Sequence, residues 1–190
     1  MKTEFFKTIY ESALKETQIT PKKDTPYYKL AGEILEMALA YRDDGITFLN
    51  SGDRVNAHAA FCYGFGWLDF GIGSGLINGN IPKCRIPVFS EDMPKHLTDH
   101  LSEKTTRYFR MLTEACDSVE SSPDKESPLH SFTEKIYALS MDSVFLGDAY
   151  LKKDEKVNAL AHFSYGYGWL DAAVRAGLFK ITDKRELFTV

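Results

Sequence analysis

His96 and His100 stand one helical turn apart, a spacing that can hold a zinc ion. A zinc site needs at least one further protein ligand, and the glutamate that acts as general base in an HExxH motif is missing between these histidines. Charged neighbours such as Lys95 and Glu103 favour a solvated helix face instead. We therefore predict no metal site and no requirement for any other cofactor.

Glycines cluster at residues 64–66 and 71–75, where they could be taken for a phosphate-binding loop. Such a loop follows a strand and opens a helix, and no strand is predicted before these residues. A second copy of the segment, described below, carries Ala173 and Arg175 in place of Gly71 and Gly73. We therefore interpret the glycines as packing residues and predict no nucleotide site.

Asp69 and Asp171 recur at matching positions of the two copies, although a helical wheel places both opposite the apolar arc of their helices. Either carboxylate could hydrogen-bond a neighbouring helix end or loop, and Asp171 could pair with Arg175 one turn later. Alternatively, they are polar anchors in a ligand cleft. Asn56 and Asn158 lie near the starts of the same helices, where capping is favoured over ligand recognition.

No Ser-His-Asp or Cys-His arrangement can be assembled, which favours a protein that is not an enzyme. The 190 residues include 23 basic and 27 acidic side chains, giving a net charge of −4. Both copies are mildly acidic, which speaks against nucleic-acid binding, although basic pairs occur at Lys83 and Arg85 and at Lys184 and Arg185.

The sequence also predicts a cytoplasmic protein. No apolar run approaches the roughly 20 residues that cross a bilayer, and the N-terminus lacks the apolar core of a signal peptide. The three cysteines, Cys62, Cys84 and Cys116, show no CxxC spacing and are typical of a reducing compartment.

An internal duplication organises the chain. Residues 55–69 recur as residues 157–171 with 11 identities in 15 positions at a constant offset of 102. The prolines of the preceding loops align at the same offset. We divide the chain into a first repeat (1–79), a Pro-containing linker (80–94), a second repeat (95–181) and a C-terminal tail (182–190), all in one compact unit.

Apolar residues at helical spacing predict three helices in each repeat. They span about 3–17, 27–50 and 54–77 in the first repeat and about 95–119, 129–152 and 156–179 in the second. The linker and the tail are expected to be short extended pieces over the bundle. The predicted fold class is therefore all-α, a helical bundle of two tandem three-helix repeats with internal pseudo-symmetry.

The third helix of each repeat is apolar over more than half of its circumference, so we expect the two third helices to bury against one another. Their aromatic residues would then line a seam between the repeats. The candidate binding residues are those of this segment: Asn56, Tyr63, Trp67, Asp69, Asn158, Tyr165, Trp169 and Asp171.

The same segment resembles the archaeal domain-of-unknown-function family 357. The resemblance rests on the turn Gly52-Asp53, on Ala57, on residues 63–69 and on Gly75-Leu76. The second copy repeats these features except the Gly-Asp turn. The resemblance implies an all-α cytosolic archaeal protein and implies no chemistry.

Abundant aromatic residues without a catalytic set lead us to expect a non-enzymatic protein-interaction or scaffold module, which binds a protein partner or a second copy of itself. The alternative is a small-molecule-binding protein or an enzyme that uses a cleft between the repeats. An exposed apolar patch would favour the first interpretation, and a deep pocket with converging polar groups would favour the second.

Overall fold

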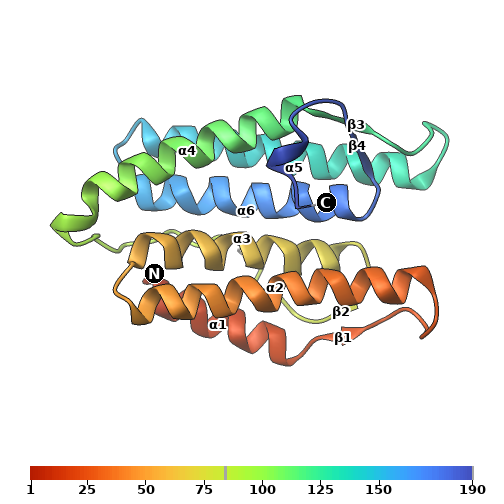
Figure 1. The fold of residues 1–190 in the computed structure, drawn as a ribbon, viewed down its shortest axis with the longest axis horizontal. Coiled ribbons are helices and arrows are strands. Elements are labelled where there is room, and N and C mark those ends of the chain that lie inside the picture. The colour runs from red at the N-terminus through yellow and green to blue at the C-terminus, as the bar shows by residue number, and fades with distance from the viewer. Residues whose placement is uncertain (84, 190) are drawn as a thin grey trace.

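Six long helices in two groups of three build the fold, as a computed structural model describes it for residues 1–83 and 85–189 (Figure 1). The first repeat holds α1 (Thr3–Lys15), α2 (Pro26–Asn50) and α3 (Arg54–Gly73). The second holds α4 (Thr98–Asp117), which follows the short 3₁₀ helix η1 (Lys95–Leu97), then α5 (Pro128–Leu151) and α6 (Lys156–Arg175). The predicted all-α fold of two tandem repeats is confirmed.

Two short antiparallel strand pairs, which the sequence did not predict, close the repeats. β1 (Gln18–Ile19) pairs with β2 (Ile77–Asn78), and β3 (Val119–Ser121) pairs with β4 (Phe179–Ile181). The third helices end at Gly73 and Arg175 rather than at 77 and 179, because Gly75 and Gly177 have φ values of +76° and +73° and turn the chain out of the helix.

Local sequence explains where most of these helices begin. Thr25 and Ser127 cap α2 and α5 with their hydroxyl groups, and a proline follows each cap at the first helical position. Asp53 caps α3 by accepting from the backbone N–H of Asn56 at 3.0 Å. The matching helix α6 begins after Glu155 with no side-chain cap.

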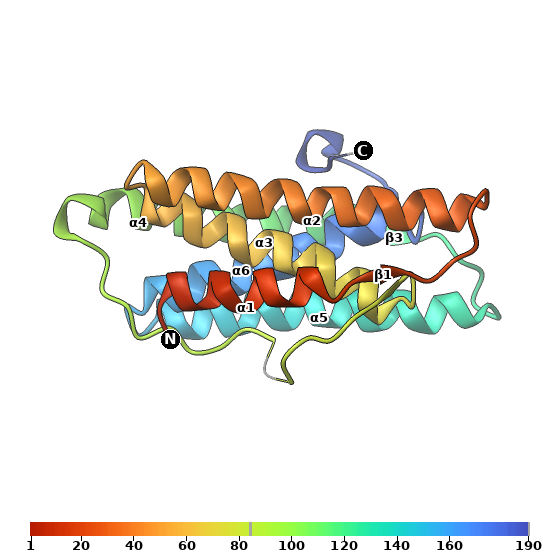
Figure 2. The same ribbon diagram turned by 90° about the horizontal axis from the view of Figure 1, so that it is seen from below.

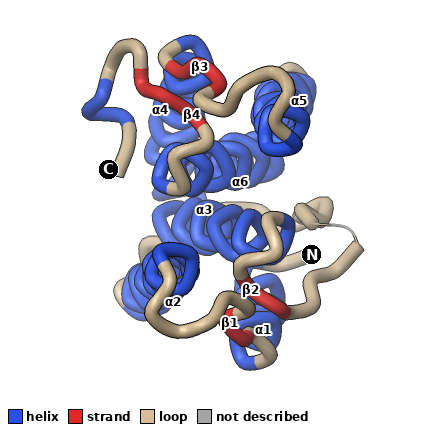
Figure 3. The backbone as a smooth tube through the Cα atoms, turned by 90° about the vertical axis from the view of Figure 1, so that its right-hand side faces the viewer, coloured by secondary structure: helices blue, strands red, loops and turns tan. Residues whose placement is uncertain are grey.

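The two third helices form the centre of the molecule. Seen along the bundle, α3 and α6 lie against each other, with α1 and α2 outside one and α4 and α5 outside the other (Figure 3). They cross at Gly66 and Gly168, where a Cβ added at Gly66 would lie 2.5 Å from the backbone oxygen of Tyr165. Glycine is required at the crossing because the two backbones touch there.

The linker and the tail lie on opposite sides of this crossing (Figure 2). The linker is held where Phe89 N donates to Asn158 Oδ1 at 2.7 Å and Asn158 Nδ2 donates back to Phe89 O at 3.1 Å. The tail contains the 3₁₀ helix η2 (Arg185–Leu187) and is held partly by a hydrogen bond from Tyr167 to Leu187 O. Both segments thus lie over the bundle, as the sequence predicted, but the tail is not extended throughout because it contains η2.

Two further observations concern the cysteines and the membrane prediction. Cys62 and Cys116 are buried and free, while Cys84 lies outside the described residues. Among the described helices, none combines the length and apolar character needed to cross a membrane.

Candidate functional site

The two matching carboxylates lie inside the seam between the repeats. Asp69 and Asp171 are both 0% exposed. The helical-wheel expectation that they face away from the packed side is therefore wrong. A wheel counts only the residues of one helix, whereas α3 and α6 are covered on nearly all sides by other helices, the linker and the tail.

Each carboxylate accepts a hydrogen bond from a tyrosine of the opposite repeat. Tyr165 OH donates to Asp69 Oδ2, and Tyr63 OH donates to Asp171 Oδ2. Trp169 Nε1 lies 3.0 Å from Tyr165 Oη and 3.2 Å from Asp69 Oδ2. Its counterpart Trp67 is fully buried on α3. Tyr63, Tyr165 and Trp169 thus line the predicted seam, with both aspartates inside it.

Burial sets the protonation of these groups. Desolvation raises the pKa of both carboxyls, against the lowering effect of the tyrosine hydrogen bonds. Desolvation, together with the charge of the facing aspartate, also raises the pKa of Tyr63 and Tyr165. The tyrosines therefore remain neutral donors at physiological pH.

The third partner differs between the two ends of the seam. Arg85 Nε of the linker lies 3.0 Å from Asp69 Oδ2, and Asp69 Oδ1 has no hydrogen-bond partner among the described residues. At the other end, Thr189 N donates to Asp171 Oδ1 at 3.1 Å and Thr189 Oγ1 donates to Oδ2 at 2.9 Å. Asp171 is therefore completed by a neutral residue and Asp69 by a charged one.

The spacing along α6 suggested that Arg175 pairs with Asp171, but the structure shows a different partner for Arg175. Its guanidinium extends to the other repeat, where Nε and Nη2 both lie 3.0 Å from Glu33 Oε2. The aspartate is turned into the seam, so the residue one turn later cannot reach it.

A groove of about 550 Å³ opens beside the Asp69 end, between α5, α6 and the linker. Three partners of Asp69 line it, namely Arg85, Tyr165 and Trp169, so the carboxylate lies directly behind the groove wall. Apolar side chains form most of the remaining lining, among them Ile86, Phe132, Ile136, Leu139 and Leu146.

Four further polar side chains complete the groove lining: Lys135, Asp142, Ser143 and His162. Desolvation lowers the pKa of His162 to about 4, so this imidazole is neutral at physiological pH. Lys135 and Asp142 carry opposite charges. The groove is therefore apolar with a balanced charged rim.

The matching place in the first repeat is closed. Tyr41 stands where the second repeat has Ser143, and its ring packs on Tyr63 with centroids 4.4 Å apart. The pair Glu33 and Arg175 stands where the groove has Lys135 and Gly73, and bridges the opening. One bulky ring and one ion pair thus fill the space that is open in the second repeat.

The two candidate asparagines, Asn56 and Asn158, do not contact Asp69 or Asp171 in the described structure. Asn158 holds the linker backbone at Phe89, and Asn56 contacts the Asp53 side chain and accepts from Lys104 Nζ. Neither side chain caps its helix by accepting a backbone N–H, so the capping interpretation is wrong for both. Asp53 has that role at α3 because it precedes the first turn.

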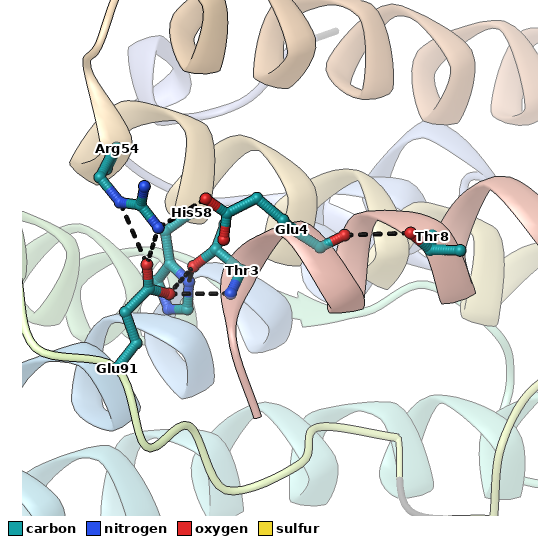
Figure 4. Close-up of polar contacts among 6 residues, drawn as sticks. All are labelled: Thr3, Glu4, Thr8, Arg54, His58 and Glu91. Carbon is teal, nitrogen blue, oxygen red and sulfur yellow. Dashed lines mark hydrogen bonds and ion pairs between the residues drawn. The ribbon is translucent and has the colours of Figure 1, made fainter.

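Sequence reasoning missed a polar network around Glu91, which joins the N-terminus, α3 and the linker (Figure 4). Glu91 Oε2 accepts from Thr3 N at 2.8 Å and from Thr3 Oγ1 at 2.6 Å, while Arg54 Nε donates to Oε1 at 3.1 Å. Arg54 also pairs with Glu4 at 2.7 Å. Sequence separations of up to 88 residues left no local pattern to find.

His58 completes this network on α3. Its Nδ1 lies 3.0 Å from Thr3 Oγ1, and its Nε2 donates to Val157 O at 3.0 Å. Desolvation lowers the pKa of His58 to about 4. Burial would raise the pKa of Glu91, but hydrogen bonds from Thr3 and Arg54 outweigh it and lower that pKa. A neutral imidazole and an ionised carboxylate therefore fasten the first repeat to the linker.

The predicted absence of a metal site concerned His96 and His100. His100 Nδ1 lies 3.7 Å from Asp53 Oδ1. In the part of the chain that the structure describes, no three His, Cys, Asp or Glu side chains are grouped so as to hold a metal ion.

Comparison with known proteins adds the family and nothing about activity. Residues 6–77 and residues 107–179 each match the family described as "Protein of unknown function (DUF357)". No curated protein and no solved structure matches the chain. The two matched segments coincide with the two three-helix repeats and cover most of the sequence. The chain therefore belongs to the DUF357 family and contains two tandem copies of its domain.

Proposed function

We propose that this protein is a non-enzymatic binding protein that takes up an apolar small molecule in the groove between α5, α6 and the linker. The observation that carries the proposal is the difference between the repeats: Ser143 lines an open groove, whereas Tyr41 at the matching position packs its ring on Tyr63. The volume of about 550 Å³ lies within the range of ligand pockets, roughly 300–1,000 Å³.

The chemistry of the lining supports binding rather than catalysis. The groove is mainly apolar, and three of its polar side chains, Arg85, Tyr165 and Trp169, meet at Asp69. No nucleophile paired with a base lines it in the described part of the chain. We also propose a cytoplasmic location, which the free buried thiols of Cys62 and Cys116 support.

The test exchanges one residue between the repeats. The uncharged apolar dye N-phenyl-1-naphthylamine, whose emission rises in apolar surroundings, is titrated into the protein. We expect saturable one-to-one binding that is at least tenfold weaker in Ser143→Tyr, because the new ring would cover Tyr165 as Tyr41 covers Tyr63.

Ser102→Tyr, at a half-buried position of α4 that does not line the groove, is the control and should bind the dye as the wild type does. Thermal unfolding of both variants verifies that they fold. The proposal is wrong if the wild type does not bind the dye, or if Ser143→Tyr binds it equally well.

A second candidate is the protein-interaction module that the sequence favoured, with a second copy of this chain as the partner. It is supported by Phe145 and Leu146 on α5, which are 64% and 50% exposed, whereas the first repeat has Asp43 and Asp44 at these positions. Sedimentation velocity tests it. A dimer that the double substitution Phe145→Asp and Leu146→Asp converts to monomer supports it, and a wild-type monomer at tens of micromolar contradicts it.

A further inference from the structure

Arg85 lies in the Asp69 end of the groove as a ligand would. Its Nε is 3.0 Å from Asp69 Oδ2, and its guanidinium carbon is 5.9 Å from the centroid of the Trp169 ring. A buried carboxylate beside an indole face is the combination that recognises guanidinium and ammonium groups, through charge and through the ring quadrupole. A side chain of the linker therefore supplies a cation to a preformed cation site.

The carboxylate has acceptor capacity that Arg85 does not use. All the contacts of Asp69 with Tyr165, Trp169 and Arg85 go to Oδ2, and Oδ1 has no hydrogen-bond partner among the described residues. Asp69 is nevertheless 0% exposed. An unsatisfied oxygen of a buried carboxylate is costly, and a cation with several N–H donors would relieve that cost.

The opposite end of the seam shows that such a carboxylate does not need a cation for structural reasons. Asp171 has the same tyrosine contact, and Thr189 satisfies both of its oxygens with neutral donors. Burial alone therefore does not explain the positive charge at Asp69.

Arg85 is also placed so that its guanidinium can move away from Asp69. Its side chain is 48% exposed, and it belongs to the linker rather than to a helix. Arg85, Tyr165 and Trp169 separate the groove from Asp69, and of these three Arg85 is the one that no helix holds in place. The other groups of the groove would not oppose a cation as a set, since Lys135 is balanced by Asp142 and His162 is neutral.

We propose that Asp69, Tyr165 and Trp169 form a binding site for an organic cation, a guanidinium or ammonium group on an apolar body, which binds by displacing Arg85. This inference rests on the proposed function, since the apolar body occupies the groove. Arg85 competes with the ligand from within the chain, at the millimolar effective concentration typical of a short tether. Removing Arg85 should therefore strengthen binding.

Isothermal titration with two matched compounds tests the site. Benzylguanidine carries the cation, and benzylurea has nearly the same shape without the charge. We expect Arg85→Ala to bind benzylguanidine at least tenfold more tightly than the wild type does, and at least tenfold more tightly than it binds benzylurea.

Two double variants test whether the preference for benzylguanidine over benzylurea comes from Asp69. Adding Asp69→Asn to Arg85→Ala should lower the affinity for benzylguanidine to that for benzylurea, whereas adding Asp171→Asn should leave the preference unchanged. The inference is overturned if Arg85→Ala shows no gain over the wild type or no preference for the cation, or if the Asp171 variant loses the preference as the Asp69 variant does.

These outcomes are separate from those of the proposed function. If the dye binds the wild type and Ser143→Tyr weakens it, while Arg85→Ala does not prefer benzylguanidine, the groove binds apolar molecules and only the cation site is refuted. If a double variant does not fold, as judged by thermal unfolding, the comparison of Arg85→Ala with the wild type still decides the inference.

Discussion

Asp69 and Asp171 occupy matching positions in the two repeats, and each accepts a hydrogen bond from the tyrosine of the other repeat. Beyond that shared contact, the two ends of the seam differ. Thr189 satisfies both oxygens of Asp171, and the Tyr41 ring fills the neighbouring space. At Asp69, the linker contributes Arg85 to a groove that remains open.

The comparison of the two ends distinguishes the residues that both repeats share at the helix crossing from the residues that differ around it. The crossing glycines and the crossed Tyr–Asp pairs are the same in both repeats. Because α3 and α6 pack on each other, each helix requires a glycine at the crossing, and each buried aspartate requires a tyrosine donor from the opposite helix. The residues around the crossing are covered by a linker on one side and a tail on the other. The contacts from these two segments are where the repeats differ, as Arg85 and Thr189 show.

The largest expected effect is at the shared crossing. Gly66→Ala should reduce the free energy of unfolding by about 3 kcal/mol or more, because the added methyl group would meet the backbone oxygen of Tyr165 at 2.5 Å and a backbone cannot turn aside as a side chain can. Gly168→Ala should cost a similar amount, since its methyl group would meet the backbone oxygen of Tyr63. Chemical denaturation measures both.

Gly32→Ala is the control, because nothing lies within 4 Å of a Cβ at that position of α2. It should stabilise the protein by about 0.5–1 kcal/mol through helix propensity. Clearly unequal losses for Gly66→Ala and Gly168→Ala would show that the crossing is not shared equally by the repeats.

A second effect concerns the starts of the third helices. His58 of the first repeat occupies the position that Leu160 has in the second repeat. The pKa of His58 is lowered from 6.5 to about 4, so the unfolded chain binds a proton in this interval and the folded chain does not. Stability is therefore lost as the pH falls from about 6.5 to 4, by up to about 3 kcal/mol for this group.

His58→Leu should remove this component, and chemical denaturation at a series of pH values measures it. Desolvation lowers the pKa of His162 to about 4 as well, but His162 and the carboxyls are common to both proteins, so the difference between wild type and variant isolates His58. Parallel pH profiles for the two proteins would contradict the prediction.

The smallest effects distinguish the crossed tyrosines. Tyr63→Phe should cost about 1 kcal/mol, because Asp171 keeps two donors from Thr189. Tyr165→Phe should cost more, about 2 kcal/mol, because it removes a donor to Asp69 and also the hydroxyl near Trp169 Nε1. Thermal unfolding of both variants gives the order, and a larger loss in Tyr63→Phe than in Tyr165→Phe would contradict the prediction.

Local sequence was sufficient for the fold. The loop prolines and the helical spacing of apolar residues predicted the six helices, since both signals depend on neighbours along the chain, and the repeat of residues 55–69 at 157–171 divided them into two units. The helix ends were less accurate. Residues 77–78 and 179–181 pair with strands about 60 residues away, which local spacing does not report.

The sequence by itself determined that the third helices are central and that Tyr63, Trp67, Tyr165 and Trp169 are buried, because a helix apolar on most faces must be buried on most faces. Only the tertiary structure decided what completes each buried carboxylate. Arg85 and Thr189 reach the aspartates from segments whose path is set by contacts distant in sequence. The physical reason is that a wheel describes one helix, while burial and charge at a site depend on everything that packs around it.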